Sequence, residues 1–231
     1  IKYLENLNIN ISTEKLQLLQ KYCDFLLDYN KTTNLTAIKD EDNVYLKHFY
    51  DSLTINKYLN NINTLLDIGT GAGFPGMVIA IMHPEIHVTL LDSNNKKIKF
   101  LEELIKILGI TNVSLIYGRC ETFAKDNKEK FDIVTSRAVA RLRILCELAL
   151  PLLKKDSKII ITTKMESKSY VDLTLKVMKD FGIEIENHNY QEFIIKGNQK
   201  YLGRNYKVES DYSQGAFFLC GDALGNEIHC G

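Results

Sequence analysis

The sequence predicts an α/β fold, a doubly wound Rossmann-like parallel sheet of about seven strands preceded by a small helical region. Three observations predict it. Short apolar runs alternate with longer amphipathic segments from Leu65 onward. The first run contains Asp67 and leads straight into three alternate glycines, Gly69, Gly71 and Gly73. Pro is scarce, with three in the chain, and no Gly/Ser-rich linker divides it.

The elements can be placed in chain order. Residues 13–30 carry apolar side chains three and four apart, which predicts an amphipathic helix capped by Ser12 or Thr13. The segments that follow are predicted as strands at 64–69, 87–92, 113–118, 131–136, 158–163, 183–187 and 192–197, and as helices at 75–82, 96–109, 140–153 and 168–181. We divide the chain into a helical region at 1–60, a ligand-binding domain at 61–197 and a tail at 198–231.

Composition sets loose bounds on function. Hydrophobic residues make up 45% and charged residues 25% of the 231, which is typical of a soluble globular protein. The 29 basic and 29 acidic residues cancel, so any footprint for nucleic acid must be local. The five cysteines are scattered without metal-ligand spacing, and no apolar run is long enough to span a membrane. We therefore expect a cytoplasmic protein with reduced thiols, no metal and no membrane partner.

The glycine-rich turn predicts a nucleotide-like cofactor. A strand that breaks into alternate glycines lets the backbone pass close against a ligand. In the dinucleotide fingerprint G-x-G-x-x-G the third glycine comes one residue later than Gly73 does here. This spacing, with Asp67 just before the first glycine, favours S-adenosylmethionine over a nicotinamide cofactor. A nicotinamide-dependent oxidoreductase is the alternative, and the chain has no matching catalytic Tyr/Lys or His arrangement.

Ligands of such a sheet bind at the carboxyl ends of the strands, so the residues there can be given roles. Asp92 ends the second strand, and its two carboxylate oxygens suit the two ribose hydroxyls of the cofactor. The alternative is that Asp92 caps the following helix. Ser93 and Asn94 belong to the same turn.

Two further turns complete the predicted site. After the third strand, residues 118–121 could hold an adenine edge through a backbone amide and Glu121, although Arg119 and Glu121 could instead form a salt bridge. After the fourth strand, Arg137 would face the open end where a substrate approaches. The alternative is that Arg137 is a surface ion-pair partner.

Six segments together resemble one family. They are NLTAI (34–38), HFYDS (48–52), DIGTGAGFPG, LLDSNNKKIKFLEEL, GRCETF and SRAVARL. Over residues 14–153 they resemble the bacterial methyltransferases that modify guanine N7 of 16S ribosomal RNA, formerly called the glucose-inhibited division protein B family. The resemblance implies a class I methyltransferase fold, S-adenosylmethionine as cofactor, and 16S ribosomal RNA or the small ribosomal subunit as partner. It implies cofactor contacts at Gly69, Phe74, Asp92, Ser93, Asn94, Cys120, Glu121 and Arg137.

This chain departs from the family at two of those positions. The family usually has Leu where this chain has Asn94, and a small residue or Val where it has Cys120. Backbone contacts would tolerate both changes.

The implied chemistry is modest, because guanine N7 is already nucleophilic and needs no general base. Arg137 would be the catalytic residue as an orienting donor, to guanine O6 or to an RNA phosphate. We expect the RNA face to draw on local basic residues, for which the candidates are Lys31, Lys39, Lys47, His48, Lys96 and Lys97. The alternative is that each of these lysines is a solvated surface charge, which is the more frequent case for a single lysine.

From about Leu150 the sequence resembles an internal segment of enolpyruvylshikimate-phosphate synthase, so the chain is an apparent chimera. Ser167 and Tyr170 match residues that contact shikimate 3-phosphate in that enzyme. The match covers about a sixth of the synthase, too little to build its active site. We expect 158–197 to supply the fifth, sixth and seventh strands, and 212–225 to form an amphipathic helix.

The tail lacks the basic character that the methyltransferase family tends to show there. Its three basic and four acidic residues suggest reduced RNA affinity. A cofactor-binding domain that no longer methylates RNA is therefore the alternative function. A remnant carboxyvinyltransferase segment that binds shikimate 3-phosphate is a remote one.

Overall fold

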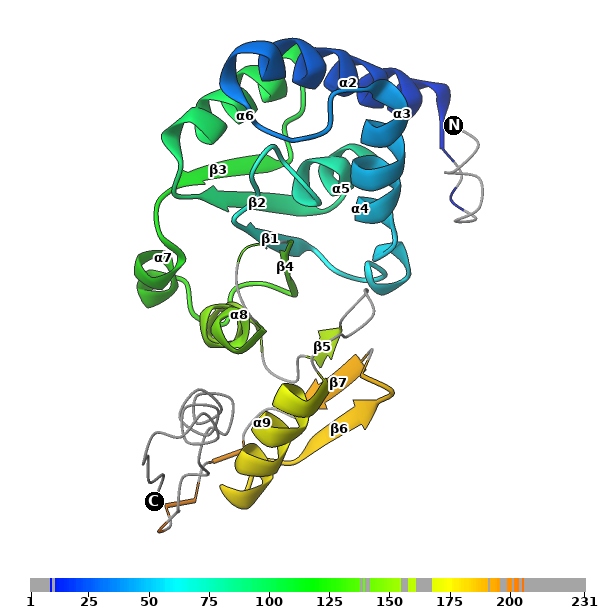
Figure 1. Ribbon diagram of the computed structural model, residues 1–231. Coiled ribbons are helices and arrows are strands. Elements are labelled where there is room, and N and C mark those ends of the chain that lie inside the picture. Colours follow the sequence, from blue (N-terminus) through cyan, green and yellow to red (C-terminus); the bar gives the residue numbers. More distant parts are fainter. Residues whose placement is uncertain are drawn as a thin grey trace, which may run out of the picture.

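Two separate sheets organise the chain (Figure 1). The computed structural model describes residues 9, 11–137, 139, 142–154, 158–160, 168–190, 192–195, 199–200, 202–203 and 205. The helix expected at 212–225 and Ser167 lie outside these residues. In the described part no helix is both long and apolar enough to cross a bilayer.

Four parallel strands form the main sheet, in the order β3-β2-β1-β4. They are β1 (Thr64–Ile68), β2 (His87–Asp92), β3 (Val113–Tyr117) and β4 (Ile133–Ser136). The chain steps outward from β1 to β3 and then returns to the other side of β1 for β4. The strand order therefore reverses beside β1, which is where ligands bind in doubly wound sheets.

Helices cover both faces of this sheet. They are α5 (Gly76–Met82), α6 (Asn95–Leu108), α7 (Cys120–Asp126) and α8 (Leu142–Ala149), the last followed by the 3₁₀ turn η3 (Leu150–Leu152). Successive strand residues point to opposite faces. Leu65 accordingly belongs to the apolar cluster under α5 and α6, whereas Leu66 belongs to the cluster that includes Cys120 of α7.

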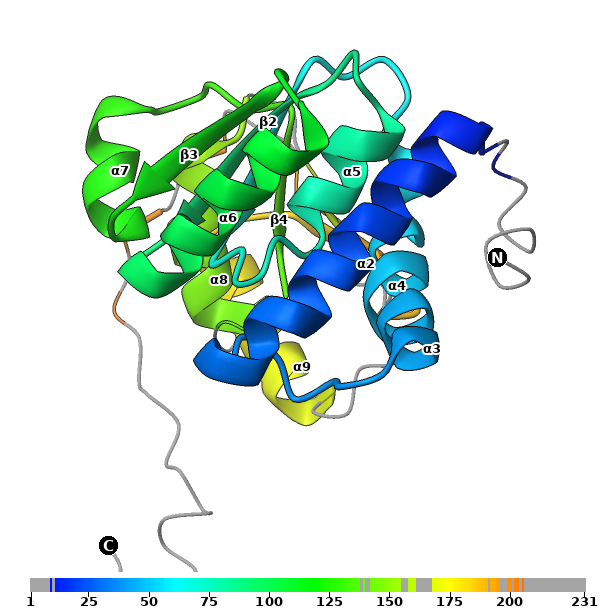
Figure 2. The same ribbon diagram turned by 90° about the horizontal axis from the view of Figure 1, so that it is seen from above.

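The N-terminal helices join the first of these clusters. They are α2 (Thr13–Thr33), α3 (Glu41–Val44), the π-helical turn η1 (Tyr45–Tyr50), α4 (Asp51–Leu53) and the 3₁₀ turn η2 (Asn56–Tyr58). Ser12 caps α2 as predicted, by accepting a hydrogen bond from the Lys15 amide. Figure 2 shows α2 lying across α5 and α6, and Phe25 stacks on Phe100 there at 5.3 Å. The helical region and the sheet thus share one core.

The last three strands form their own antiparallel sheet, in the order β5-β7-β6. They are β5 (Lys158–Ile160), β6 (Ile185–His188) and β7 (Glu192–Ile195), with α9 (Lys168–Asp180) after β5. Strands and helix form where the sequence predicts them, but the expectation of one seven-stranded sheet is wrong. The main sheet has four strands among the described residues.

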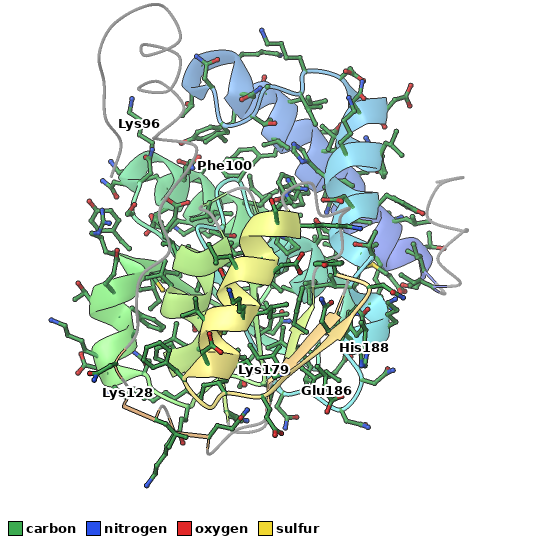
Figure 3. The ribbon with its side chains drawn as sticks, turned by 60° about the horizontal axis from the view of Figure 1, so that its bottom comes forward. Lys96, Phe100, Lys128, Lys179, Glu186 and His188 are labelled. Atoms are coloured by element: carbon green, nitrogen blue, oxygen red, sulfur yellow. The ribbon has the colours of Figure 1, made fainter. Side chains whose placement is uncertain are left out.

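The surface of β6 gives a physical reason for this separation. Parallel strands of a doubly wound sheet are buried on both faces, as β1 and β2 are here. In β6, by contrast, Glu186, Asn187 and His188 are all exposed, and Figure 3 shows the first and last of them along this strand. Successive strand residues point to opposite faces, so β6 is exposed on both faces and does not suit the buried interior of a doubly wound sheet.

Candidate active site

A cavity of about 480 Å³ opens at the carboxyl ends of the main sheet. Its volume falls in the range of small-molecule sites. The turns after all four strands contribute to it, and so does the loop between α2 and α3. Eight of the residues predicted from the sequence line it: Gly69, Gly71, Phe74, Asp92, Ser93, Cys120, Glu121 and Arg137.

The glycine-rich turn presents bare backbone to this cavity. Gly71 has a φ of +63°, a conformation that side chains disfavour. A Cβ atom there would meet nothing closer than 3.9 Å, so the space beside it is open. The backbone at this turn is therefore free to approach a ligand.

Asp92 ties the second strand to the glycine turn. Its carboxylate is 6% exposed and accepts hydrogen bonds from the amides of Gly71 (2.9 Å) and Asn94 (2.8 Å). The Lys97 ammonium lies 3.6 Å from it and also lines the cavity. The alternative role for Asp92 is wrong, because Asn94 caps α6 by accepting from the Lys96 amide. Asn94 itself does not line the cavity.

Asp67 and Gly73 lie behind the turn and do not line the cavity. The Asp67 carboxylate is fully buried and accepts hydrogen bonds from the Gly76 amide (2.9 Å) and the Thr70 hydroxyl (2.7 Å). Burial raises its pKa to about 6. At Gly73 a Cβ atom would come within 2.7 Å of the Tyr22 hydroxyl oxygen. Both residues therefore shape the turn from the inside.

The end of the cavity beside β3 is formed by residues 118–121. Arg119 and Glu121 form the alternative salt bridge, at 3.1 Å, and both side chains are exposed. Burial raises the pKa of the Cys120 thiol to about 11, so it is neutral near pH 7 and is no nucleophile.

Arg137 forms the opposite side of the cavity. Its Nη1 donates to the Asp51 carboxylate (2.8 Å) and to the Lys47 carbonyl (3.0 Å), and its Nη2 donates to Nδ1 of His48 (2.7 Å). The ion pair foreseen as the alternative therefore exists. It is partly buried and joins residues 86 positions apart, so it fixes the arginine at the cavity edge.

His48 does not belong to an exposed RNA face, which corrects that expectation. Its ring is 8% exposed and stacks on Phe74 at 4.2 Å, and Nε2 bonds the Thr36 hydroxyl (2.9 Å). Both Thr36 and His48 line the cavity. The sequence pattern predicts no site role for Thr36 and places His48 on the RNA face, although the two residues fall in the NLTAI and HFYDS segments of the resemblance.

The remaining candidates lie apart from the cavity. Lys31 pairs with Asp28 on the exposed side of α2, and Lys39, Lys47 and Lys96 are exposed. Tyr170 lies on α9, and its side chain is outside the described part of the structure. No three His, Cys, Asp or Glu side chains gather to hold a metal ion in the residues that the structure describes.

Comparisons with known proteins identify the family. Residues 15–187 match the family described as rRNA small subunit methyltransferase G. The protein of that name from Bacillus licheniformis is 42% identical over 193 residues, 81% of each chain, and that from Bacillus subtilis is 43% identical over 188 residues, 79% of each.

One solved structure supports the fold alone. The crystal structure of M. jannaschii TYW2 in complex with AdoMet aligns with a TM-score of 0.50 and 14% identity, over 72% of this chain and 80% of that one. The family assignment rests on the sequence matches. The structural likeness supports only the α/β fold of the main sheet. The chain therefore belongs to the rRNA small subunit methyltransferase G family of S-adenosylmethionine-dependent methyltransferases.

Proposed function

We propose that this chain transfers a methyl group from S-adenosylmethionine to N7 of a guanine in 16S ribosomal RNA. The observation that carries the proposal is the single cavity in which the glycine turn and Asp92 face Arg137 across the carboxyl ends of the strands. Membership of the family supports both the cofactor and the class of substrate.

The lining residues fit the cofactor. The open backbone at Gly71 leaves room for its amino acid part, Gly69 lines the same cavity against the Val139 side chain, and Asp92 can accept hydrogen bonds from the ribose hydroxyls of the cofactor. We assign the adenine end of the cofactor to Ser93, Cys120 and Glu121. Phe74 and Arg137 line the opposite side of the cavity. Asp67, Gly73 and Asn94 would act by holding the turns.

The site suits a nucleophile that needs no deprotonation. The His48 lone pair accepts from Arg137, both oxygens of Asp92 accept backbone amides, and Glu121 is paired with Arg119. Each of these three groups already has a hydrogen-bond or ion-pair partner among the described residues that line the cavity. We therefore assign none of them as a general base. Guanine N7 carries its own lone pair, whereas a hydroxyl or an exocyclic amine loses a proton during methylation.

The residues would then act by positioning. Bound S-adenosylmethionine supplies a methyl group activated on a sulfonium centre. Arg137 would donate to guanine O6, leaving N7 free to attack. We place the exposed Lys39, Lys47 and Lys96 on the RNA face, and we place the enzyme in the cytoplasm, where its proposed substrate is made.

A second candidate is a cofactor-binding domain without RNA methylation. The observation that favours it is the separate sheet β5-β7-β6, which does not extend the main sheet. The main sheet and its cavity are built without these strands, so cofactor binding would survive their separation.

Two measurements separate the candidates. Calorimetric titration with S-adenosylhomocysteine tests the cavity, and methyl transfer to naked 16S RNA and to small subunits tests the function. We expect saturable binding and a product methylated at guanine N7. Binding without transfer to either substrate would favour the second candidate, and methylation of another atom would refute the N7 assignment.

A further inference from the structure

The π-helical turn η1 supplies two of the three partners that hold Arg137, Lys47 and His48. Single π-helical turns occur frequently at functional sites. At the end of this one, the Asp51 amide bonds to the His48 carbonyl, where a regular α-helix would use the Lys47 carbonyl. The Lys47 carbonyl instead accepts from Arg137. The irregular turn thus presents a carbonyl and a ring nitrogen to one guanidinium, and Asp51, the first residue of α4, adds a carboxylate.

The contact between Arg137 and His48 defines the protonation of the ring. A guanidinium can only donate, so Nδ1 of His48 must be the acceptor and carries no proton. The proton of the neutral ring then lies on Nε2, which donates to the Thr36 hydroxyl. Burial, with the charge of Arg137, lowers the pKa of His48 to about 4, so the ring is neutral near pH 7.

These contacts leave part of the arginine for a ligand. Arg137 has five N–H donors, of which three are used by Lys47, His48 and Asp51. The guanidinium also lies over the Phe74 ring, 5.3 Å from its centre. Because Arg137 lines the cavity, its two remaining donors are the ones that an acceptor in the cavity can reach.

We propose that His48 is a positioning residue for methyl transfer: its neutral ring accepts from Arg137 and, with the Lys47 carbonyl and Asp51, holds two guanidinium donors toward guanine O6. The Thr36 hydroxyl accepts the Nε2 proton of this tautomer and so holds the ring from its other edge. This inference rests on the proposed function, since the guanine is that of the 16S RNA substrate.

Ring packing is the competing explanation for His48. The ring stacks on Phe74, so removing it would loosen the core whether or not Nδ1 matters. Two substitutions separate the roles. In His48→Asn the side-chain amide reaches about as far as Nδ1 and can offer an acceptor there, whereas in His48→Gln it reaches about as far as Nε2. Both variants lack the ring, and only the first offers Arg137 its acceptor.

The kinetic experiment compares His48→Asn, His48→Gln and His48→Ala in methyl transfer to 16S RNA. We expect kcat of the Asn variant within about threefold of wild type and a loss of about tenfold or more in the other two, the scale of one charged hydrogen bond. Affinity for S-adenosylhomocysteine should change by less than about threefold in all of them. Equal losses in all three variants would overturn the proposal in favour of packing.

A spectroscopic experiment tests the geometry without any methyl transfer. In 15N spectra of the full chain, His48 should be the neutral Nε2–H tautomer at pH 7, and Arg137→Ala should make it titrate at a higher pH. An Nδ1–H tautomer would overturn the proposal, and so would a His48 pKa that is the same in wild type and in Arg137→Ala. If the tautomer is as expected but neither wild type nor any variant methylates RNA, the proposed function is wrong. The Arg137–His48 contact is then still supported.

Discussion

The two sides of the cavity are held in place in different ways. On one side, which we call the cofactor side (Gly69, Gly71 and Asp92), the turn after β1 is bonded to the turn after β2, its neighbour in the sheet. On the other, the arginine side (Arg137 with Thr36, His48 and Asp51), the contacts reach back 86 and 89 residues to the N-terminal helices. Under the proposed function, cofactor binding therefore depends on the sheet, whereas substrate orientation depends on how the helical region packs against it.

The largest effect is expected on the cofactor side, from Asp92→Asn. One carboxylate oxygen becomes an amide nitrogen, which cannot accept the Gly71 or Asn94 amide and cannot bind a ribose hydroxyl as acceptor. Loss of these charge-assisted bonds should weaken S-adenosylhomocysteine binding by about 100-fold in calorimetry. Asp28→Asn makes the same change at an exposed residue of α2 outside the cavity, so it is the control and should leave the affinity unchanged. Unchanged binding by Asp92→Asn would mean that Asp92 only holds the turn.

On the arginine side, Arg137→Lys should reduce turnover by about 10- to 100-fold, the scale of one bidentate contact to guanine. A lysine keeps the charge, but it lacks the planar guanidinium that donates to Lys47, His48 and Asp51 and to the guanine at the same time. Affinity for S-adenosylhomocysteine should stay within about threefold. A parallel loss of that affinity would show instead that Arg137 contacts the cofactor.

A smaller effect is expected where Tyr22 of α2 contacts the glycine-rich turn beside the cofactor side. The Tyr22 hydroxyl donates to the Ala72 carbonyl and its ring stacks on Phe74. Tyr22→Phe keeps the ring and removes one hydrogen bond, so the free energy of unfolding should fall by about 1 kcal/mol and S-adenosylhomocysteine binding by about threefold. Tyr29→Phe removes a hydroxyl from the same helix at a residue that packs on Phe100, and it should change neither binding nor turnover.

The smallest effect is expected in the pH dependence of stability. The His48 pKa is about 4 in the folded chain and ordinarily 6.5, so its contribution is complete above pH 6.5 and is lost as the pH falls toward 4. The charged groups nearest to it are Arg137 and Asp51. Asp67, with a pKa raised to about 6, acts in the opposite direction, since its cost disappears as the pH falls through 6.

Subtracting a variant isolates the histidine contribution. We expect the thermal midpoint of wild type relative to His48→Asn to fall between pH 6.5 and 4, and to stay constant above pH 7. A difference that does not change with pH would argue against a neutral, hydrogen-bonded His48. The measurement is thermal unfolding of both proteins in a series of buffers.

Local sequence pattern predicts the positions of the helices and strands better than it predicts how the strands pair. The strand at 87–92 and the helix that ends before Gly109 form where the apolar periodicity and the capping residues predict them. The seven-stranded sheet does not form, because the three final strands pair with one another. Side-chain periodicity identifies a strand, but it contains no information on which strand becomes its neighbour.

The alternating elements, the glycine turn and the place of Asp92 opposite it could be predicted from local pattern, because they depend on residues close in the chain or at the ends of adjacent parallel strands. The tertiary structure was needed to show that Asp67, Gly73 and Asn94 do not line the cavity and that Thr36, His48 and Asp51 secure Arg137. Those contacts require the π-helical turn and the packing of the N-terminal helices on the sheet, which no local pattern specifies.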